Sequence, residues 1–390
     1  MAAAATFSDD QAGPGTRMIR VHSLALEPHG LSQTATVSLA DEALGTPPRS
    51  LPCCTSHPGL RDGQEEQWVS EIDEHFLGLT TLYALPPDDH MVDILAISGL
   101  GSHAFGSFKQ RGGEHMWLRD ALPSHIVAPQ QQPGSQAENT TGSRPIARVM
   151  IYGYSSPVAG SSSVQNVDDL AGQLRQQLLA LVAARPNGDH RPQRPIVILS
   201  HSLGGLILKE TIISLASSQD SNVVSLRSAI GGLVFFGVPH LGMDIASLEP
   251  MAGRKGPNRA LLLSIGQDNS QFLSRQTRKF PAALEKLGSP QRPAEVFCFY
   301  ETAESPTPVW KDGKWAMDGP KTMLVSVPSA TYCIPQADPR NHTCAINRSH
   351  SELVKYAPHD DVYDLVRSKL QEIVTRAVSA AAPHPVHEAE

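Results

Sequence analysis

The sequence predicts an α/β fold in which a mostly parallel central sheet is flanked by helices. From about residue 91 onward, short aliphatic runs alternate with stretches that have the apolar spacing of amphipathic helices. This alternation is typical of parallel strands joined by crossover helices. The chain has 390 residues, of which 40% are hydrophobic, so it can bury a large core in one domain or in two smaller ones.

Apolar runs and their spacing mark the expected elements. Strands of the sheet are expected at 92–97, 148–152, 195–199, 229–237 and 296–300, with 323–327 as a further candidate. Apolar residues at i, i+3, i+4 and i+7 spacing predict amphipathic helices over 164–185 and 360–378. Two earlier strands are expected at 17–25 and 34–38, whereas 47–66, rich in proline, cysteine and histidine, is expected to be an irregular surface loop.

Composition and charge argue against several classes of protein. A net charge of −7 gives no electrostatic case for nucleic acid or an anionic membrane as partner. No apolar stretch has the length of a membrane span, and the first ten residues lack the basic and apolar regions of a secretory signal. The five cysteines have no metal-ligand spacing and suit a reducing compartment better than a disulfide framework. We therefore expect a soluble cytoplasmic protein without a metal or a cofactor.

Ser202 lies in the most informative motif of the chain. An apolar run ends in Ser200-His-Ser-Leu-Gly-Gly205, and a helical pattern follows. In this strand–turn–helix context, the motif G-x-S-x-G places a nucleophilic serine on a sharp turn above the carboxyl edge of a parallel sheet. Gly204 and Gly205 are the small residues that the turn needs, although Ser200 stands where the first glycine is usual. The motif predicts an α/β-hydrolase fold with Ser202 as the nucleophile.

A serine nucleophile needs a base to take its proton and an acid to hold that base. In this fold the acid and then the histidine follow the serine along the chain. Glu301 comes directly after the apolar run 296–300, which is where an orienting acid belongs. Glu304 is a close rival, and Asp318 and Asp338 are weaker ones because no apolar strand directly precedes them.

Three histidines are compared as the base. His350 comes just before the C-terminal helical pattern and is the expected base. His342 satisfies the same chain order and is not excluded by it. His240 precedes the acid, so we expect it to shape the floor of the pocket instead.

The oxyanion of a tetrahedral intermediate needs two N–H donors. The backbone N–H of Leu203, directly after the nucleophile, is the first candidate, because it lies at a helix N-terminus. The second candidate is the N–H of Leu100 in the loop Ile97-Ser-Gly-Leu-Gly-Ser102, whose glycines allow the backbone to approach a ligand closely.

Several segments fall outside the alternating pattern. Residues 1–16 and 379–390 are expected to be disordered, which leaves a single domain over 17–378. Residues 130–144 are rich in Gln, Ser, Gly and Thr and are expected to form a flexible loop. Residues 243–287 contain helical patterns but no strand, so they form either a helical cap over the active site or an ordinary crossover helix with a long connection.

An ordered set of motifs resembles the lipase-like α/β hydrolases that are abundant in fungi and related to serine-active-site-containing lipase-like proteins. The motifs cover roughly residues 90–370 and include Gly99-Leu-Gly-Ser-His-Ala-Phe-Gly106, His201-Ser-Leu-Gly-Gly205, Phe235-Phe-Gly-Val-Pro-His-Leu-Gly-Met243, Phe299-Tyr-Glu-Thr302 and His350-Ser-Glu-Leu-Val-Lys-Tyr356. The resemblance implies Ser202 as nucleophile, Glu301 as acid and His350 as base. The chain departs from the family at Ser98, where histidine is common, and at Ser200.

The expected function is the hydrolysis of carboxylic esters, of small molecules or lipids, through an acyl-enzyme intermediate. Acyl transfer or thioester cleavage in a biosynthetic pathway would use the same residues. A catalytically inactive domain that signals or binds is a further alternative, because one fold hosts many functions. No nucleic-acid partner is expected, and contact with a membrane surface would be weak.

Overall fold

A computed structural model describes residues 18–40, 50–54, 67–129, 144–184, 193–253, 259–267, 271–289, 292–333 and 339–381. The expectations for 1–16 and for nearly all of 130–144 lie outside the described residues. The chain divides into two compact units, one formed by Met1–Leu24 and Ala35–Glu74, the other by Ala25–Thr34 and His75–Glu390. The expectation of a single domain over 17–378 stays a prediction.

Two small sheets precede the main sheet along the chain. The strands expected at 17–25 and 34–38 are present as β1 (Met18–Leu26) and β2 (Gln33–Ala40), and they pair with each other. Strand β3 (Ser50–Cys54) pairs antiparallel with β4 (Gln67–Glu71). The prediction of an irregular loop throughout 47–66 is therefore wrong at β3. The partner strand β4 begins 13 residues after the end of β3, so no local sequence pattern predicts β3.

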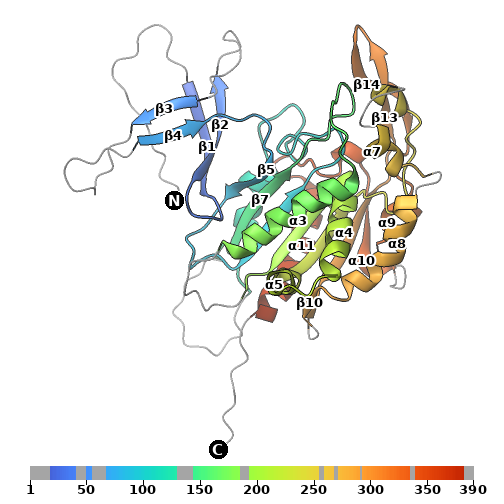
Figure 1. Ribbon diagram of the computed structural model, residues 1–390. Helices are drawn as coiled ribbons and strands as arrows, with labels where there is room; N and C mark the ends of the chain where they lie inside the picture. The colour runs from blue at the N-terminus through green and yellow to red at the C-terminus, as the bar shows by residue number, and fades with distance from the viewer. Residues whose placement is uncertain are drawn as a thin grey trace, which may run out of the picture. The chain divides into compact units, whose positions relative to one another are not determined.

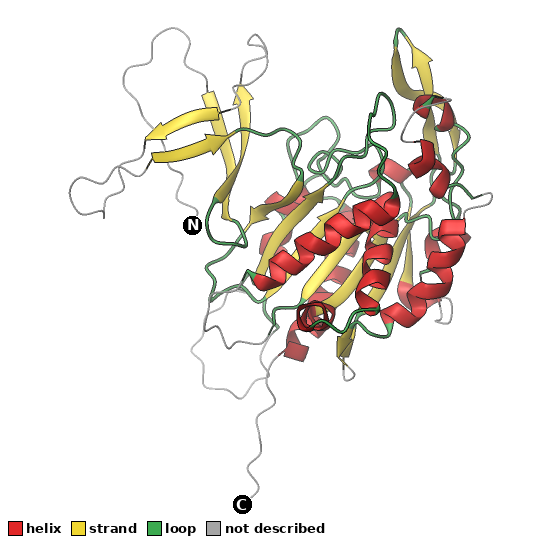
Figure 2. Cartoon of the chain, viewed as in Figure 1, coloured by secondary structure: helices red, strands yellow, loops and turns green. Residues whose placement is uncertain are grey.

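A seven-stranded sheet forms the centre of the second unit (Figures 1 and 2). The strand order is β15-β12-β9-β8-β6-β7-β5. Strand β5 is antiparallel to β7, and the other neighbours pair in parallel. The bounds are β5 (Gly78–Tyr83), β6 (Val92–Ile97), β7 (Ala147–Gly153), β8 (Ile196–His201), β9 (Ile230–Phe236), β12 (Glu295–Glu301) and β15 (Thr343–Ile346). The predicted mostly parallel sheet is confirmed.

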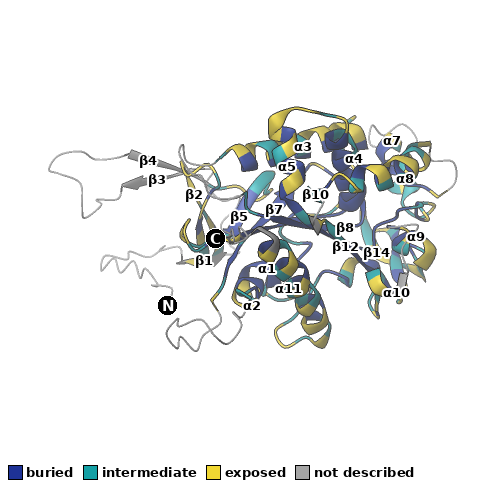
Figure 3. Ribbon diagram, turned by 90° about the horizontal axis from the view of Figure 1, so that it is seen from below, coloured by how far each residue is buried: buried dark blue, intermediate teal, exposed yellow. Residues whose placement is uncertain are grey.

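Helices cover both faces of this sheet, and the strands between them are buried (Figures 2 and 3). Side chains alternate between the faces of a strand, so β6 sends Leu95 and Ile97 into one core cluster and Ile94 and Ala96 into the other. The first cluster includes residues of α3 (Val167–Ala183), α4 (Leu203–Ala216), α5 (Ser221–Ala229) and α8 (Gln271–Leu284). The second includes residues of α1 (Trp117–Asp120), α2 (Leu122–His125) and α11 (Asp361–Ala381). Helix α11 continues past the predicted boundary at 379.

The described parts of the segment 243–287 contain helices, as expected, and these helices lie at different places in the fold. It contains α6 (Glu249–Ala252), α7 (Arg259–Ser264) and α8. Helix α8 packs against α4, where the Gln276 side-chain amide donates a 2.9 Å hydrogen bond to the Leu206 carbonyl. This part of the segment is therefore a crossover helix on the flank of the sheet.

The strand predicted at 323–327 is wrong. A hairpin of β13 (Ser305–Lys311) and β14 (Lys314–Thr322) precedes this run, and α9 (Val327–Thr331) begins within it. Ser326 caps that helix, because its hydroxyl accepts from the Ser329 N–H. The remaining elements are β10 (Gly288–Ser289), β11 (Arg292–Pro293) and α10 (Pro339–His342).

Cys298 of β12 and Cys333 after α9 form a disulfide, although the cysteine spacing favours reduced thiols. The pairing brings together residues from two elements that are separate in the sequence, so spacing gives no sign of it. None of the helices within the described ranges combines the length and the apolar character needed to cross a membrane.

Candidate active site

Ser202 lies at the turn between β8 and α4. Its backbone has φ 52° and ψ −126°, a conformation that residues with a Cβ rarely adopt. The Ser202 N–H donates to the Phe236 carbonyl at 3.0 Å, which ties the turn to β9. A Cβ on Gly204 would lie 2.4 Å from the Ser98 carbonyl oxygen. The strand, the turn and the helix can therefore pass this closely only with glycine at that position.

The structure brings Ser202, His350 and Glu301 together at the carboxyl edge of the sheet. The Ser202 Oγ lies 2.9 Å from His350 Nε2, and His350 Nδ1 lies 2.9 Å from Glu301 Oε1. Their exposed fractions are 5%, 7% and 1%, respectively. In this arrangement the carboxylate favours the imidazole tautomer with hydrogen on Nδ1, which leaves Nε2 free to accept the serine proton.

Two further groups hold the acid and the base in place. The Val325 N–H donates to Glu301 Oε1 at 3.2 Å, and the His350 N–H donates to the Ser305 hydroxyl at 2.9 Å. Ser305 begins β13, and Val325 follows β14, so both ends of the hairpin contact the acid–base pair. Neither residue was predicted from the sequence, because one acts through its backbone and the other belongs to no motif.

His201 also supports His350. Its Nε2–H donates to the His350 carbonyl at 2.9 Å, and the two rings lie 4.9 Å apart. Burial, with a smaller effect of His350, lowers the pKa of His201 to about 3. His201 therefore stays neutral at physiological pH and acts as a positioning residue for His350.

The rival acids lie apart from the base. Glu304 is exposed and lines the cavity described below, but His350 Nδ1 contacts Glu301. Asp318 is exposed on the hairpin, where it pairs with Lys311 at 3.6 Å. Asp338 lies outside the described residues.

The two rival histidines, His342 and His240, also lie away from the Ser202–His350–Glu301 contacts. His342 donates from Nδ1 to the Val296 carbonyl at 3.2 Å, near the amino end of β12 and thus away from Glu301 at its carboxyl end. His240 was expected at the floor of the pocket, and the structure contradicts this. It is fully buried and does not line the cavity. Instead it packs edge-on against Phe235 and accepts from Lys209 Nζ at 3.3 Å, because the turn after β9 directs it into the core beside α4.

A cavity of about 670 Å³ contains Ser202 and His350 among its lining residues. Its apolar wall consists of Leu100, Val158, Met243, Leu248, Met251, Pro306, Met317 and Leu324. Arg111 and Glu352 also line it and form an ion pair at 2.6 Å. Part of the segment 243–287 therefore flanks the site, while α8 does not, and the hairpin supplies a wall that was not predicted from the sequence.

The loop that carries Leu100 reaches the candidate nucleophile. A Cβ on Gly99 would lie 2.9 Å from the Ser202 Cβ. The Tyr154 hydroxyl donates to the Ser98 carbonyl at 2.9 Å, and this bond fixes one end of the loop. Leu203 is the first residue of α4, so its N–H lies at the helix N-terminus.

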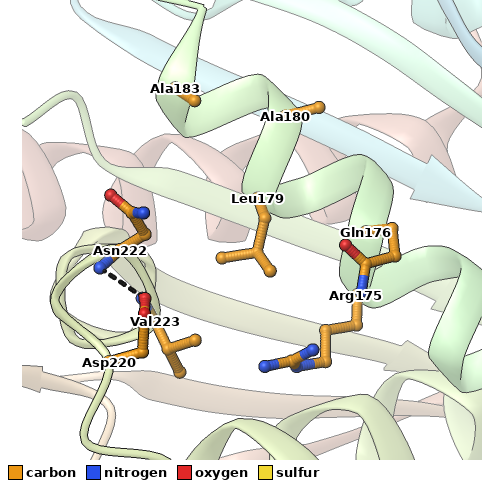
Figure 4. A pocket seen from close by; sticks show the side chains of 8 residues that line it. All are labelled: Arg175, Gln176, Leu179, Ala180, Ala183, Asp220, Asn222 and Val223. Carbon is orange, nitrogen blue, oxygen red and sulfur yellow. Dashed lines mark hydrogen bonds between the residues drawn. The ribbon is translucent and has the colours of Figure 1, made fainter.

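A second hollow lies between α3 and the start of α5 (Figure 4). Its volume is about 520 Å³, and the side chains shown include Arg175, Leu179 and Asp220. The residues that line it include no serine, cysteine or histidine, so it offers no nucleophile–base pair. Within the described ranges, no group of His, Cys, Asp and Glu side chains is arranged to hold a metal ion.

The known proteins to which this chain is similar include a phospholipase and a lipase. The phospholipase PlaB of Legionella pneumophila, solved with thio-NAD, matches 54% of this chain and 38% of its own, with 14% identity and a TM-score of 0.33. The mature lipase BlEst2 of Bacillus licheniformis matches 75% of this chain and 97% of its own, with 12% identity and a TM-score of 0.42. Human SERAC1 is 24% identical to this chain over 155 residues, which are 40% of this chain. The matched part is 22% of the length of SERAC1. No protein-family model matches the chain.

The topology of the chain is that of the α/β-hydrolase fold: a mostly parallel seven-stranded sheet between two layers of helices, with a serine on the turn from β8 to α4.

Proposed function

We propose that the protein is a serine hydrolase that cleaves carboxylic esters through an acyl-enzyme intermediate. One observation carries the proposal: Ser202 Oγ, His350 and Glu301 are linked by two 2.9 Å contacts, and the serine and histidine line a single cavity. This is the arrangement that makes a serine hydroxyl nucleophilic.

In the proposed reaction, Ser202 Oγ attacks the ester carbonyl carbon while His350 Nε2 takes the hydroxyl proton. The Glu301 carboxylate stabilises the imidazolium that forms. The N–H groups of Leu203 and Leu100 are the proposed donors to the oxyanion. The carbon–oxygen bond to the alcohol then breaks, the alcohol takes the proton from His350, and the acyl group stays on Ser202. A water molecule, activated by His350, releases the acid and restores the serine hydroxyl.

The wall of the cavity supports an acyl chain as the bound group. Leucine, methionine and valine side chains line it beside Ser202, and each buried methylene of a substrate contributes about 0.8 kcal/mol to binding. The KM for a series of esters should therefore fall as the acyl chain lengthens, until the cavity is filled.

Labelling with a fluorophosphonate probe and hydrolysis of a short-chain nitrophenyl ester test the proposal. Wild type should react in both assays, and Ser202→Ala should react in neither. Ser228→Ala is the matched control, because Ser228 is exposed on α5. Labelling that survives in Ser202→Ala would refute Ser202 as the nucleophile, and a folded wild type that resists the probe would favour an inactive domain. Product analysis with alcohols and with thioesters separates ester hydrolysis from acyl transfer and thioester cleavage.

A further inference from the structure

The hairpin of β13 and β14 exposes large apolar side chains. Trp310 is 61% exposed, and Met317 is 53% exposed. The rings of Trp310 and Trp315 contact each other edge to face, with centroids 5.4 Å apart. The two strands pack mainly against each other, and the hairpin extends beyond the helices that flank the sheet (Figure 1). Core packing therefore does not account for these side chains.

Charged side chains, with lysines in excess, accompany the apolar ones on this hairpin. The hairpin carries three lysines and two aspartates, namely Lys311, Lys314, Lys321, Asp312 and Asp318. The Lys311–Asp318 pair is 3.6 Å apart with both side chains more than half exposed, so water screens it strongly. The hairpin thus bears a small positive excess on a chain whose net charge is −7.

Tryptophan and lysine together suit one environment in particular. The indole ring has an apolar body and a polar N–H, and it favours the boundary between lipid headgroups and acyl chains. A lysine near an anionic lipid surface is attracted to it, while its methylene stem covers apolar surface. The local charge of the hairpin, rather than the net charge of the chain, decides this contact because charges beyond about 10 Å are screened in salt.

The hairpin is continuous with the candidate active site. Met317 and Lys321 of β14 line the cavity that contains Ser202. At the base of the hairpin, beside Lys321, Ser305 of β13 accepts from the His350 N–H. A surface that binds the tip would therefore adjoin the wall of the cavity.

We propose that the hairpin tip, residues 310–315, docks the protein on a lipid surface that contains anionic headgroups. The substrate would then be an ester lipid that enters the cavity from that surface. The docking itself is independent of catalysis, whereas the identity of the substrate rests on the proposed hydrolase function.

Vesicle binding of the full chain tests the docking. In a Ser202→Ala background, which removes turnover, the protein should sediment with vesicles of phosphatidylcholine and phosphatidylglycerol more than with phosphatidylcholine alone. The double variant Trp310→Ala/Trp315→Ala should lower the partition coefficient about tenfold. Lys311→Gln/Lys314→Gln should remove most of the preference for the anionic vesicles. Leu31→Ala is the matched control, because Leu31 is 83% exposed, and it should bind as wild type does.

Activity assays separate failure of docking from failure of the proposed function. The double tryptophan variant should keep the turnover of a soluble short-chain ester and lose about tenfold in hydrolysis of the same ester group presented in anionic vesicles. Equal sedimentation of the tryptophan variant and its parent would overturn the docking proposal. So would a dimer in solution that the tryptophan variant abolishes, since the tip would then bind a second copy. Vesicle binding without hydrolysis of any ester would leave docking supported and refute the hydrolase.

Discussion

Replacing Glu301 with glutamine removes the negative charge beside His350 and preserves the size of the side chain. Glu301 Oε1 accepts from both His350 Nδ1 and the Val325 N–H, while Oε2 is buried without a partner. An amide oxygen at the Oε1 position would keep both bonds and leave the new NH₂ buried and unpaired. The opposite orientation would set the NH₂ against the Val325 N–H. Either arrangement leaves a buried donor unsatisfied, which costs about 1–3 kcal/mol.

The larger consequence concerns the imidazolium that forms when His350 takes the serine proton. Opposite charges about 4 Å apart attract by about 4 kcal/mol at an effective dielectric constant near 20. This attraction is present in the transition state but not in the ground state, so losing it raises the activation barrier. Each increase of about 1.4 kcal/mol in the barrier lowers the rate tenfold. Glu301→Gln should therefore lower kcat/KM by about a thousandfold.

The assay is hydrolysis of a short-chain nitrophenyl ester, with a thermal unfolding curve for each variant. Glu304→Gln is the informative comparison, since Glu304 is the nearby rival on the cavity wall, and it should cost far less activity. The reasoning fails if folded Glu301→Gln stays within about tenfold of wild type, or if Glu304→Gln loses more than Glu301→Gln does.

Four other substitutions have defined outcomes. His350→Gln should lower kcat/KM by about a thousandfold or more, whereas His342→Gln should not change it measurably, and the same ester assay compares them. Gly204→Ala places a methyl carbon 2.4 Å from the Ser98 carbonyl oxygen, so both the midpoint of thermal unfolding and the rate of fluorophosphonate labelling should fall; an unchanged midpoint would contradict this close approach of helix and loop. Burial lowers the pKa of Lys209 to about 7, so the unfolded chain binds the proton of this lysine more tightly than the folded chain does. The resulting cost to folding is complete below pH 7 and disappears as the pH rises toward about 10.4. Lys209→Met should consequently raise the free energy of unfolding in urea at pH 7, with a gain that shrinks toward pH 10, and a gain independent of pH would contradict the shifted pKa.

The inner strands of the sheet could be predicted because both of their faces are buried. Strands β6, β8 and β9 are nearly continuous apolar runs, which is the pattern of a parallel sheet covered by helices. The edge strands β5 and β15 were missed, since both are only partly buried and their sequences are not continuous apolar runs. The strand predicted at 323–327 was wrong because an apolar run of that length is equally compatible with a helix start.

The sequence pointed to the side chains that meet at the candidate site more readily than to the groups that hold them. Chain order and strand position favoured Glu301 and His350, and the structure places both within hydrogen-bond reach of each other. The roles of Ser305 and Val325 depend on contacts between distant parts of the chain, so no local pattern reveals them. The hairpin itself did have a signal: an Asp-Gly pair at its turn, between two tryptophans, is a strong mark of a tight β-turn.

The positive φ of Ser202 lowers the folding stability at a position where the proposed reaction requires a serine. Holding a residue with a Cβ at φ 52° costs about 1–3 kcal/mol, and glycine would relieve that cost at the expense of the proposed nucleophile. A library of variants screened only for resistance to heat or protease would therefore enrich glycine at this site. The same library screened for ester hydrolysis would restore serine, so comparing the two enrichments would measure how much folding stability the protein gives up for its chemistry.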